Sequence, residues 1–413
     1  MSFCFVHAAD LHLDTPFAGV GPVPPDLRAR LRDASLAAFD HLVELALARD
    51  AAFVLLAGGI YDGPERGLRA QVRVRQGLER LAERGIPVVI VAGAGEPAGD
   101  WPAIPTWPAT VTRVPPGPIR PVPVVRDGQR LATIYGASGA PARAARDLTR
   151  VAAPGIHVAL LHVPARGLAE LGSPDALAAR GLDYWALGGE HAARLLTVRQ
   201  PWLVYPGTTQ GRGPDPDELG PKGAMVVPVE DGRVGPPELV PLDAVRVVAL
   251  EVDLGALPDP AALRAELLAS ADALRAQHGR DLVVHVVLRD PEAARRGPLS
   301  AAATAALLRD LRAAVAGSAP AVWWATLRSA PPAGPSADAI GERTDFAAEV
   351  RRLAAELAAD PARLRALLGE RLTLPPAGTL ERAVRPLDEA ALAALLRDAE
   401  ALAVVLLEER DPS

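Results

Sequence analysis

Short apolar runs alternate with amphipathic segments through the first half of the chain. Runs such as FCFV, AFVLLA and PVVIVAG are short enough for buried strands, and the longer segments between them repeat apolar residues at helical spacing. We expect these helices at about residues 26–49 and within the arginine-rich stretch 66–85. This alternation is typical of a layered α/β domain.

A second series of apolar runs follows a proline-rich stretch at residues 101–125. The prolines favour an extended loop and an edge strand, because proline cannot donate a hydrogen bond to a strand ladder. Five later runs are spaced like strands and end in turn residues: RLATIYG, IHVALLH, DYWALGG, PWLVYPG and AMVVPVE. The two series predict an α/β fold with two sheets packed face to face and helices outside, over residues 1–242.

The pattern changes after about residue 241. Strand and helix patterns alternate in the order βαβαβ through residues 243–332, which predicts a small α/β capping domain. Residues 333–413 begin as a linker rich in proline and alanine, then show helical patterns at 346–368 and 387–407. The apolar faces of these last helices suit either packing onto the preceding domain or docking onto a partner.

Composition and charge narrow the class of protein. The chain has 413 residues, 49% of them hydrophobic, and a net charge of −6, which is a globular composition without a strongly electropositive surface. No apolar stretch approaches the ~20 residues of a membrane-spanning helix, and no cleavable signal opens the chain, so we expect a cytoplasmic protein. Cys4 is the single cysteine, so any metal must be held by oxygen and imidazole.

Candidate chemistry gathers at the ends of the predicted strands. Asp10 and His12 follow the first strand in AADLHLD, and His162 closes IHVALLH. The sequences GGIYDGPE, GAGEP and GGEH follow three other runs. Because α/β folds place their sites at strand ends, these loops are expected to meet. A carboxylate and an imidazole two residues apart form a weak signal alone.

This ordered set resembles the calcineurin-like metallophosphoesterases, and among them the SbcD/YhaO-type DNA-repair exonucleases. The resemblance covers about residues 3–242 and extends beyond the metal motifs, to HAADLHLDTPF, FVLLAGGIYD, LRAQ, GIPVVIVAG, DYWALGG and YPGTTQGR. It implies a two-sheet sandwich, a site for two metal ions and phosphodiester hydrolysis. The family motifs read D-x-H, G-D-x-x-D, G-N-H-D/E, a lone histidine and G-H-x-H.

The motifs are only partly kept in this chain. By resemblance, Asp10, His12 and His191 match ligands of the first metal, and His162 matches one ligand of the second. The positions implied for the remaining ligands and for the histidine that assists the leaving group carry glycine or alanine. These are Gly59 for the bridging aspartate, Ala94 for an asparagine, Gly189 for a histidine and Gly95 for the assisting histidine.

These replacements limit the metals that the chain is expected to hold. Without the bridging carboxylate nothing offsets the repulsion of two cations ~3.5–4 Å apart, so a complete dinuclear site is not expected. Two histidines and a carboxylate remain a legitimate ligand set for one divalent cation, with Mn²⁺ as the family-like choice. The alternative is no metal at all, with the retained residues satisfied by backbone groups and water.

Neighbouring polar residues have more ordinary interpretations. We expect Asp62 and Glu96 to organise loops, and Glu190 to face solvent unless its side chain turns inward as an oxygen ligand. Arg212 in QGR is a candidate phosphate contact or a loop brace. No catalytic residue is assigned.

Two functions follow from the resemblance. The first is a pseudo-nuclease, impaired in cleavage, that engages DNA or serves as a scaffold for an SMC-like coiled-coil ATPase of the SbcC/YhaN type. The second is an active single-metal phosphodiesterase or exonuclease that uses Asp10, His12 and His191. Assembly with a second copy of the chain is compatible with both, and no membrane partner is expected.

Overall fold

The fold was analysed in a computed structural model. It describes residues 2–61, 67–93, 96, 104, 106–139, 148, 150–257, 259–289, 301–329, 346–371, 396 and 399–400. The chain divides into two compact units: Met1–Leu250, Leu267–His285 and Asp310–Thr326 form one, and Glu251–Glu266, Val286–Arg309 and Leu327–Ser413 form the other. The domain boundaries predicted at residues 242 and 332 stay a prediction.

The first sheet contains the N-terminal strand. In the described part of the chain its order is β12-β11-β1-β2-β3-β4, with β13 also paired to β11. Neighbours from β1 to β4 are parallel, whereas β11 is antiparallel to β1. The strands are β1 (Ser2–Ala8), β2 (Val54–Ala57), β3 (Val88–Val91), β4 (Val111–Arg113), β11 (Gly223–Glu230), β12 (Arg233–Val234) and β13 (Glu238–Pro241).

The second sheet has the order β5-β6-β7-β8-β10-β9 among the described residues. Its central strands β6, β7, β8 and β10 are parallel. The proline-bearing strand β5 lies at the edge, as predicted from its missing donors. The strands are β5 (Arg120–Arg126), β6 (Gln129–Ala137), β7 (Ile156–His162), β8 (Tyr184–Gly188), β9 (Arg194–Leu195) and β10 (Trp202–Tyr205).

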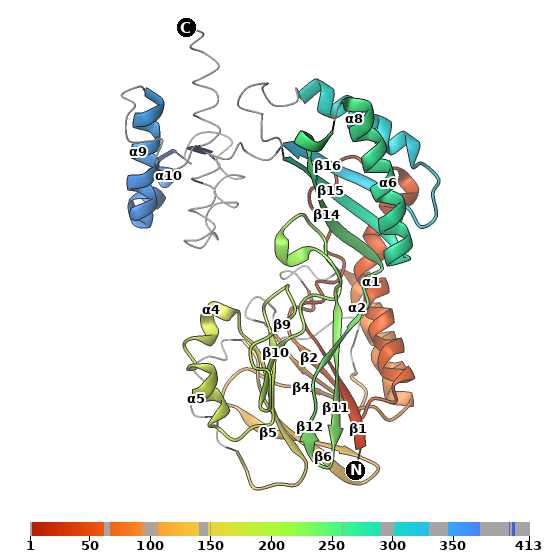
Figure 1. The fold of residues 1–413 in the computed structure, drawn as a ribbon. Coiled ribbons are helices and arrows are strands. Elements are labelled where there is room, and N and C mark those ends of the chain that lie inside the picture. The colour runs from red at the N-terminus through yellow and green to blue at the C-terminus, as the bar shows by residue number, and fades with distance from the viewer. Residues whose placement is uncertain are drawn as a thin grey trace. The chain divides into compact units, whose positions relative to one another are not determined.

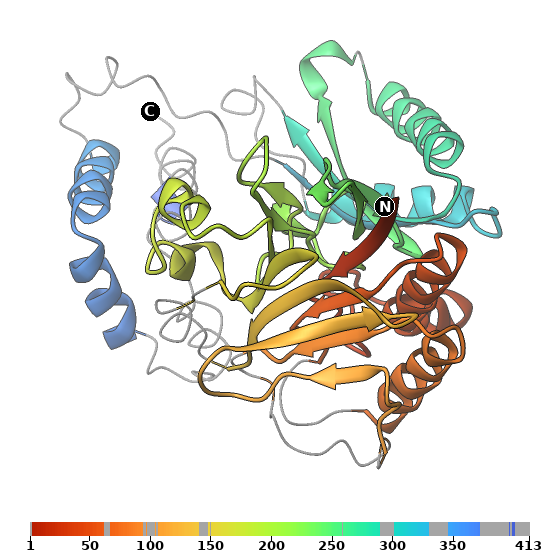
Figure 2. The ribbon, with the colours of Figure 1, turned by 90° about the horizontal axis from the view of Figure 1, so that it is seen from below.

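The two sheets pack face to face, and helices cover their outer faces. Phe5 belongs to the core between the sheets, whereas the next residue, Val6, belongs to the core beneath the helices, as the period of two in a strand requires. Helices α1 (Pro25–Ala48) and α2 (Leu68–Glu83) cover the first sheet, and α4 (Ala165–Leu168) and α5 (Pro174–Ala178) cover the second. Figures 1 and 2 show these layers in two directions. The predicted α/β sandwich is confirmed.

A three-stranded sheet of order β14-β15-β16 follows along the chain. Its strands are β14 (Val245–Asp253), β15 (Asp281–Arg289) and β16 (Val322–Ser329), with η2 (Leu254–Ala256), α6 (Pro260–His278) and α8 (Ala301–Ala314) between them. This reproduces the predicted βαβαβ order. Within the first unit, Trp323 and Val283 pack with Leu31 of α1, and Trp323 Nε1 donates to the Val20 carbonyl at 2.9 Å.

The predicted helical stretch at 346–368 is two helices, α9 (Phe346–Ala359) and α10 (Pro361–Arg371). Pro361 cannot continue a helix but fits the first position of a new one, and Asp360 caps it by accepting from Arg363 N at 3.0 Å. Most of the expected helix at 387–407 and of the expected linker lies outside the described residues. Over the described part of the chain, no helix combines the length and the apolar character that crossing a membrane requires.

Candidate metal centre

The loop after β1 presents Asp10 and His12 in an unusual backbone conformation. Asp10 has φ 51° and His12 has φ 43°, a region that non-glycine residues rarely occupy. The loop is held there by hydrogen bonds to the loop after β2, from Asp10 N to Gly58 O at 2.9 Å and from His12 N to Gly59 O at 2.8 Å. Strained backbone maintained by surrounding structure is common at functional sites.

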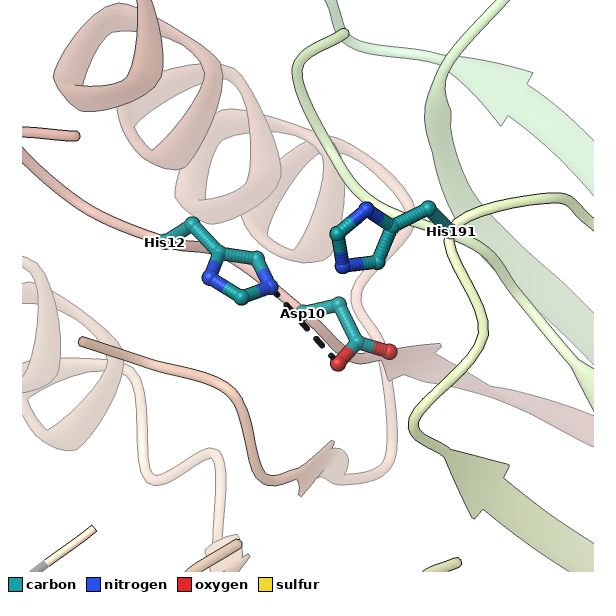
Figure 3. A group of neighbouring side chains, drawn as sticks. All are labelled: Asp10, His12 and His191. Atoms are coloured by element: carbon teal, nitrogen blue, oxygen red, sulfur yellow. Dashed lines mark ion pairs between the residues drawn. The ribbon is translucent and has the colours of Figure 1, made fainter. Parts of the chain in front are cut away.

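Asp10, His12 and His191 converge on one point. Each offers one ligand atom, and these atoms lie within 4.8 Å of one another. His12 Nε2 is 3.9 Å from Asp10 Oδ1, and the two imidazole centroids are 4.8 Å apart. Figure 3 shows the Asp10 side chain next to both rings, which come from the loops after β1 and β8. The structure therefore brings together the three residues that the resemblance assigned to the first metal.

Asp10 is held by the backbone around it. Its Oδ2 accepts from Gly189 N at 2.8 Å, and its carbonyl accepts from the Thr208 hydroxyl at 2.6 Å. Burial raises the pKa of the Asp10 carboxyl, and His162, Gly189 N–H, His12 and His191 only partly offset this effect. A cation beside Asp10 would act in the opposite sense, because nearby positive charge favours the carboxylate.

His191 is oriented by a residue that the sequence did not single out. Its Nδ1 lies 2.5 Å from Glu218 Oε1, and Glu218 also accepts from Arg212 N at 2.8 Å. Burial acts to lower the pKa of His191, but the hydrogen bond and charge of Glu218 outweigh it and raise the pKa. Burial likewise acts to raise the pKa of Glu218, but His191 and Arg212 outweigh it and lower the pKa to about 2. Both shifts favour the charged pair.

Arg212 contacts the Glu218 side of this pair. The residue is only 7% exposed, and its guanidinium NH2 donates to Glu218 Oε1 at 3.3 Å. This contact agrees with the bracing interpretation of Arg212. Its assignment as a phosphate contact stays a prediction.

His162 lies beside the cluster with a different partner. Its Nδ1 donates to the Ala57 carbonyl at 2.8 Å and is 3.8 Å from Asp10 Oδ1. The ring packs closely on glycine backbone: a Cβ at Gly58 would lie 2.6 Å from its Nδ1, and one at Gly93 would lie 3.0 Å from its Cδ2. Among the described residues, His162 does not join the three-residue ligand group.

Gly59 and Gly189 have backbones that leave little room for a side chain. Gly59 has φ +68°, and a Cβ there would lie 2.7 Å from the Asp10 Cα. Gly189 has φ +106°, and a Cβ there would lie 2.9 Å from Pro164 N. Ala94 and Gly95, like Asp62, lie outside the described residues. At Gly59 and Gly189, the space that ligand side chains would need is filled by neighbouring backbone.

The carboxylates of Glu96 and Glu190 accept hydrogen bonds from backbone N–H groups of neighbouring segments. Glu96 accepts from Gly59 N at 3.1 Å, Ile60 N at 2.5 Å and Gly93 N at 2.6 Å, so it organises the loops after β2 and β3 as predicted. Glu190 accepts from Ala165 N at 2.6 Å, and its side chain is 16% exposed. Solvent exposure of Glu190 was the favoured expectation and is wrong, because this side chain turns to the start of α4.

The donor set fits one divalent cation. Two imidazoles and one carboxylate form a recognised ligand group that leaves coordination positions open. Because Glu218 occupies Nδ1 of His191, Nε2 is the atom left for a cation. At the second position the glycine backbones offer no side-chain donor and His162 does not join the ligand group, so the residues described there do not fit a second metal.

The layers form an α/β sandwich of two sheets with a candidate ligand cluster at the strand ends. No family model matches the chain. Over 242 residues it is 35% identical to a protein described as "Uncharacterized metallophosphoesterase YhaO" from Bacillus subtilis (strain 168). The match covers 56% of this chain and 58% of that relative, so the chain spans less than two thirds of its length. This similarity supports the metallophosphoesterase superfamily for the aligned part.

A solved structure also aligns with the chain. The crystal structure of TT1561 of Thermus thermophilus shares 15% identity, with a TM-score of 0.33, over 59% of this chain and 100% of that one. A similarity of this size adds nothing to the assignment.

Proposed function

We propose that this protein binds one divalent cation at Asp10, His12 and His191, and engages phosphodiester groups at DNA ends without efficient two-metal hydrolysis. The observation that supports this proposal is the contrast between the two halves of the site. The first ligand group is assembled and braced, whereas neighbouring backbone fills the space around Gly59 and Gly189.

Two-metal hydrolysis needs a clamp on both the attacking and the leaving oxygen, and a bridging carboxylate that offsets the repulsion between the cations. Glycine at position 59 provides no such bridge. A single bound cation would supply Lewis-acid polarisation of one phosphoryl oxygen. Asp10 and the two imidazoles would hold that cation, and Glu218 would hold the proton on His191 Nδ1.

The second candidate is a single-metal phosphodiesterase. It would use the same oriented His191, which favours cation binding in both candidates, because a ligand that is already positioned loses little freedom when the cation binds. The two candidates share the cation site and differ in turnover.

Metal analysis and a nuclease assay separate the candidates. The full chain is titrated with MnCl₂ by calorimetry and then incubated with linear duplex DNA in the same buffer. We expect one cation per chain, loss of binding in His12→Ala, and cleavage near background. Glu251→Gln is the matched control, because Glu251 is an exposed carboxylate paired with Arg289 in the second unit.

Strong cleavage that His12→Ala abolishes would establish the active phosphodiesterase instead. Cation binding that is unchanged in Asp10→Asn and His191→Gln would refute the proposed site.

We further propose that the protein acts in the cytoplasm with DNA and an SMC-like coiled-coil ATPase of the SbcC/YhaN type. The support is the family resemblance together with the helices α9 and α10; α9 is amphipathic and its apolar residue Leu353 is 49% exposed. Co-purification of such an ATPase with the full chain, and its loss on deletion of residues after Pro335, is the expected result. Retention of the ATPase by the truncated chain would exclude these helices as the docking element.

A further inference from the structure

We propose that Glu218 is a positioning residue that keeps the His191 proton on Nδ1, so that Nε2 is the atom presented to Asp10 and His12. This inference rests on the proposed function, because it explains how the ligand His191 is oriented in the proposed cation site. The position of the proton is nevertheless a property of the chain alone, and it is measurable without any cation.

The contact between the two side chains determines which nitrogen carries the proton. An ionised carboxylate only accepts hydrogen bonds, and Glu218 Oε1 lies 2.5 Å from His191 Nδ1, so Nδ1 must donate. The burial of the Glu218 side chain, which is 10% exposed, makes this partner important, because an unpaired carboxylate there would be strongly unfavourable.

Glu218 is itself fixed from two directions. Its Oε2 accepts from the backbone N–H of Arg212 at 2.8 Å, and its Oε1 faces the guanidinium of the same residue at 3.3 Å. It ends the short helix η1 (Pro216–Glu218), and its carbonyl approaches Gly211 so closely that a Cβ at that position would collide with it. The carboxylate therefore has little freedom to turn away from His191.

The backbone segments carrying the two residues are also tied together. The Lys222 ammonium donates to the His191 carbonyl at 3.1 Å and to the Asp217 carbonyl. His191 and Glu218 thus remain neighbours although 27 residues separate them. The orientation of His191 is set before a cation arrives, which is the arrangement expected when a carboxylate supports a histidine ligand.

Nitrogen NMR of the metal-free chain tests the proposal directly. The full chain is labelled with ¹⁵N-histidine, and His191 is assigned by its absence in His191→Gln. At a pH above the pKa of His191, where the ring holds a single proton, we expect the wild-type ring to carry that proton on Nδ1. We expect Glu218→Ala to shift the population toward the Nε2–H form, which free imidazole side chains favour in water, and Glu218→Gln to restore Nδ1–H in part, since its amide oxygen still accepts.

A second variant at position 218 keeps the proposal testable if the first does not fold. Should Glu218→Ala fail to fold, Glu218→Asp keeps the charge but shortens the side chain by one methylene, and the same shift toward Nε2–H is expected. Glu251→Ala is the control and leaves the His191 signals unchanged. A wild-type ring protonated on Nε2, or a ring unaffected by Glu218→Ala or Glu218→Asp, would overturn the proposal.

Calorimetry with MnCl₂ then tests whether the orientation matters for binding. Loss of a carboxylate that supports a histidine ligand weakens metal affinity by about 10–100-fold, and we expect a loss in this range for Glu218→Ala. Equal affinity in wild type and Glu218→Ala would show that Glu218 has no positioning role. Absence of binding to the wild type would contradict the proposed function, and the NMR result would still decide the position of the proton.

Discussion

Gly59 shows how one residue limits the chemistry of the whole site. Its left-handed backbone, and the 2.7 Å that would separate a Cβ at this position from the Asp10 Cα, mean that restoring a carboxylate needs a backbone shift as well as a new side chain. A strained backbone position costs on the order of 1–3 kcal/mol. We therefore expect that restoring the carboxylate at position 59 alone does not restore a second metal position.

We predict that Gly59→Asp destabilises the protein and leaves cation binding at one per chain. The free energy of unfolding should fall by about 1–3 kcal/mol, because the new Cβ meets the Asp10 backbone in a conformation that suits glycine. Urea denaturation measures the first effect, and titration with MnCl₂ measures the second. Gly59→Ala is the matched control that separates strain from charge. Two cations per chain in Gly59→Asp would contradict this interpretation of the backbone.

His7 provides a second prediction at the scale of the residue. It is fully buried, its Nδ1 lies 3.0 Å from the Tyr184 hydroxyl, and burial lowers its pKa from 6.5 to about 3. The folded state therefore stays unprotonated at His7 while the unfolded state binds a proton below pH 6.5. The stability attributable to neutral His7 is present above pH 6.5 and is lost as the pH falls toward 3.

The comparison is between wild type and His7→Gln in urea at pH 7.5, 6 and 5. One proton corresponds to at most about 1.4 kcal/mol per pH unit, so the stability advantage of wild type should shrink by about 2 kcal/mol at pH 5. Tyr184→Phe, which keeps His7 buried, should retain the dependence on pH. A constant difference between wild type and His7→Gln from pH 7.5 to 5 would refute the assignment.

The residues themselves show what sequence could and could not predict. Asp10 and His12 lie two residues apart directly after a strand, so local spacing and family resemblance were enough to place them. Glu218 belongs to the unremarkable segment DPDELG, and its role depends on a fold that returns it to His191. Glu190 was misread for the same reason, since its partner Ala165 is distant in sequence. Contacts between distant loops leave no periodic signal.

At the scale of the element, the loop after β10 explains why the motif YPGTTQGR has no ligand of its own. Thr208 donates to the Asp10 carbonyl, and Arg212 supports the carboxylate that orients His191. Gln210 is fully buried and anchors the loop, donating to Val245 O at 2.5 Å and accepting from Ala244 N at 2.9 Å. The loop acts as a support beneath the ligand cluster.

The close contact of α1 and α2 gives a prediction at the same scale. Gly77 lies inside α2, and a Cβ there would lie 2.6 Å from Phe39 Cε1 and 2.9 Å from Val43 Cγ2. Alanine is the better helix former by about 1 kcal/mol, but overpacking a filled core costs about 1–3 kcal/mol. Because both neighbours are buried, we expect Gly77→Ala to be less stable than wild type by about 1 kcal/mol in urea denaturation.

A double-mutant cycle identifies the cause. Phe39→Leu removes ring atoms from the contact, so Gly77→Ala should cost less in that background than in wild type. Equal costs in both backgrounds would mean that the helix contact is not the reason for glycine at this position.

At the scale of the whole molecule, the ligand cluster joins segments that are far apart in the chain. Asp10 and His12 follow β1, His191 follows β8, and Glu218 precedes β11, all within the first compact unit. A cation bound there would stabilise only the folded arrangement, because the unfolded chain does not bring these donors together. Stability and cation binding should therefore be linked.

We predict that MnCl₂ raises the thermal and urea stability of the wild type, by an amount that grows with the logarithm of the free cation concentration above the dissociation constant. At a free concentration 100 times the dissociation constant the gain is about 2.7 kcal/mol, and a chelator should remove it. Asp10→Asn keeps the side chain's size but removes its charge, so its response to MnCl₂ should be much smaller. Glu251→Gln, at an exposed carboxylate that is not part of the ligand group, should respond like wild type. Equal gains in Asp10→Asn and wild type would place the cation elsewhere, because removing the single carboxylate among the three donors must weaken a site built from them.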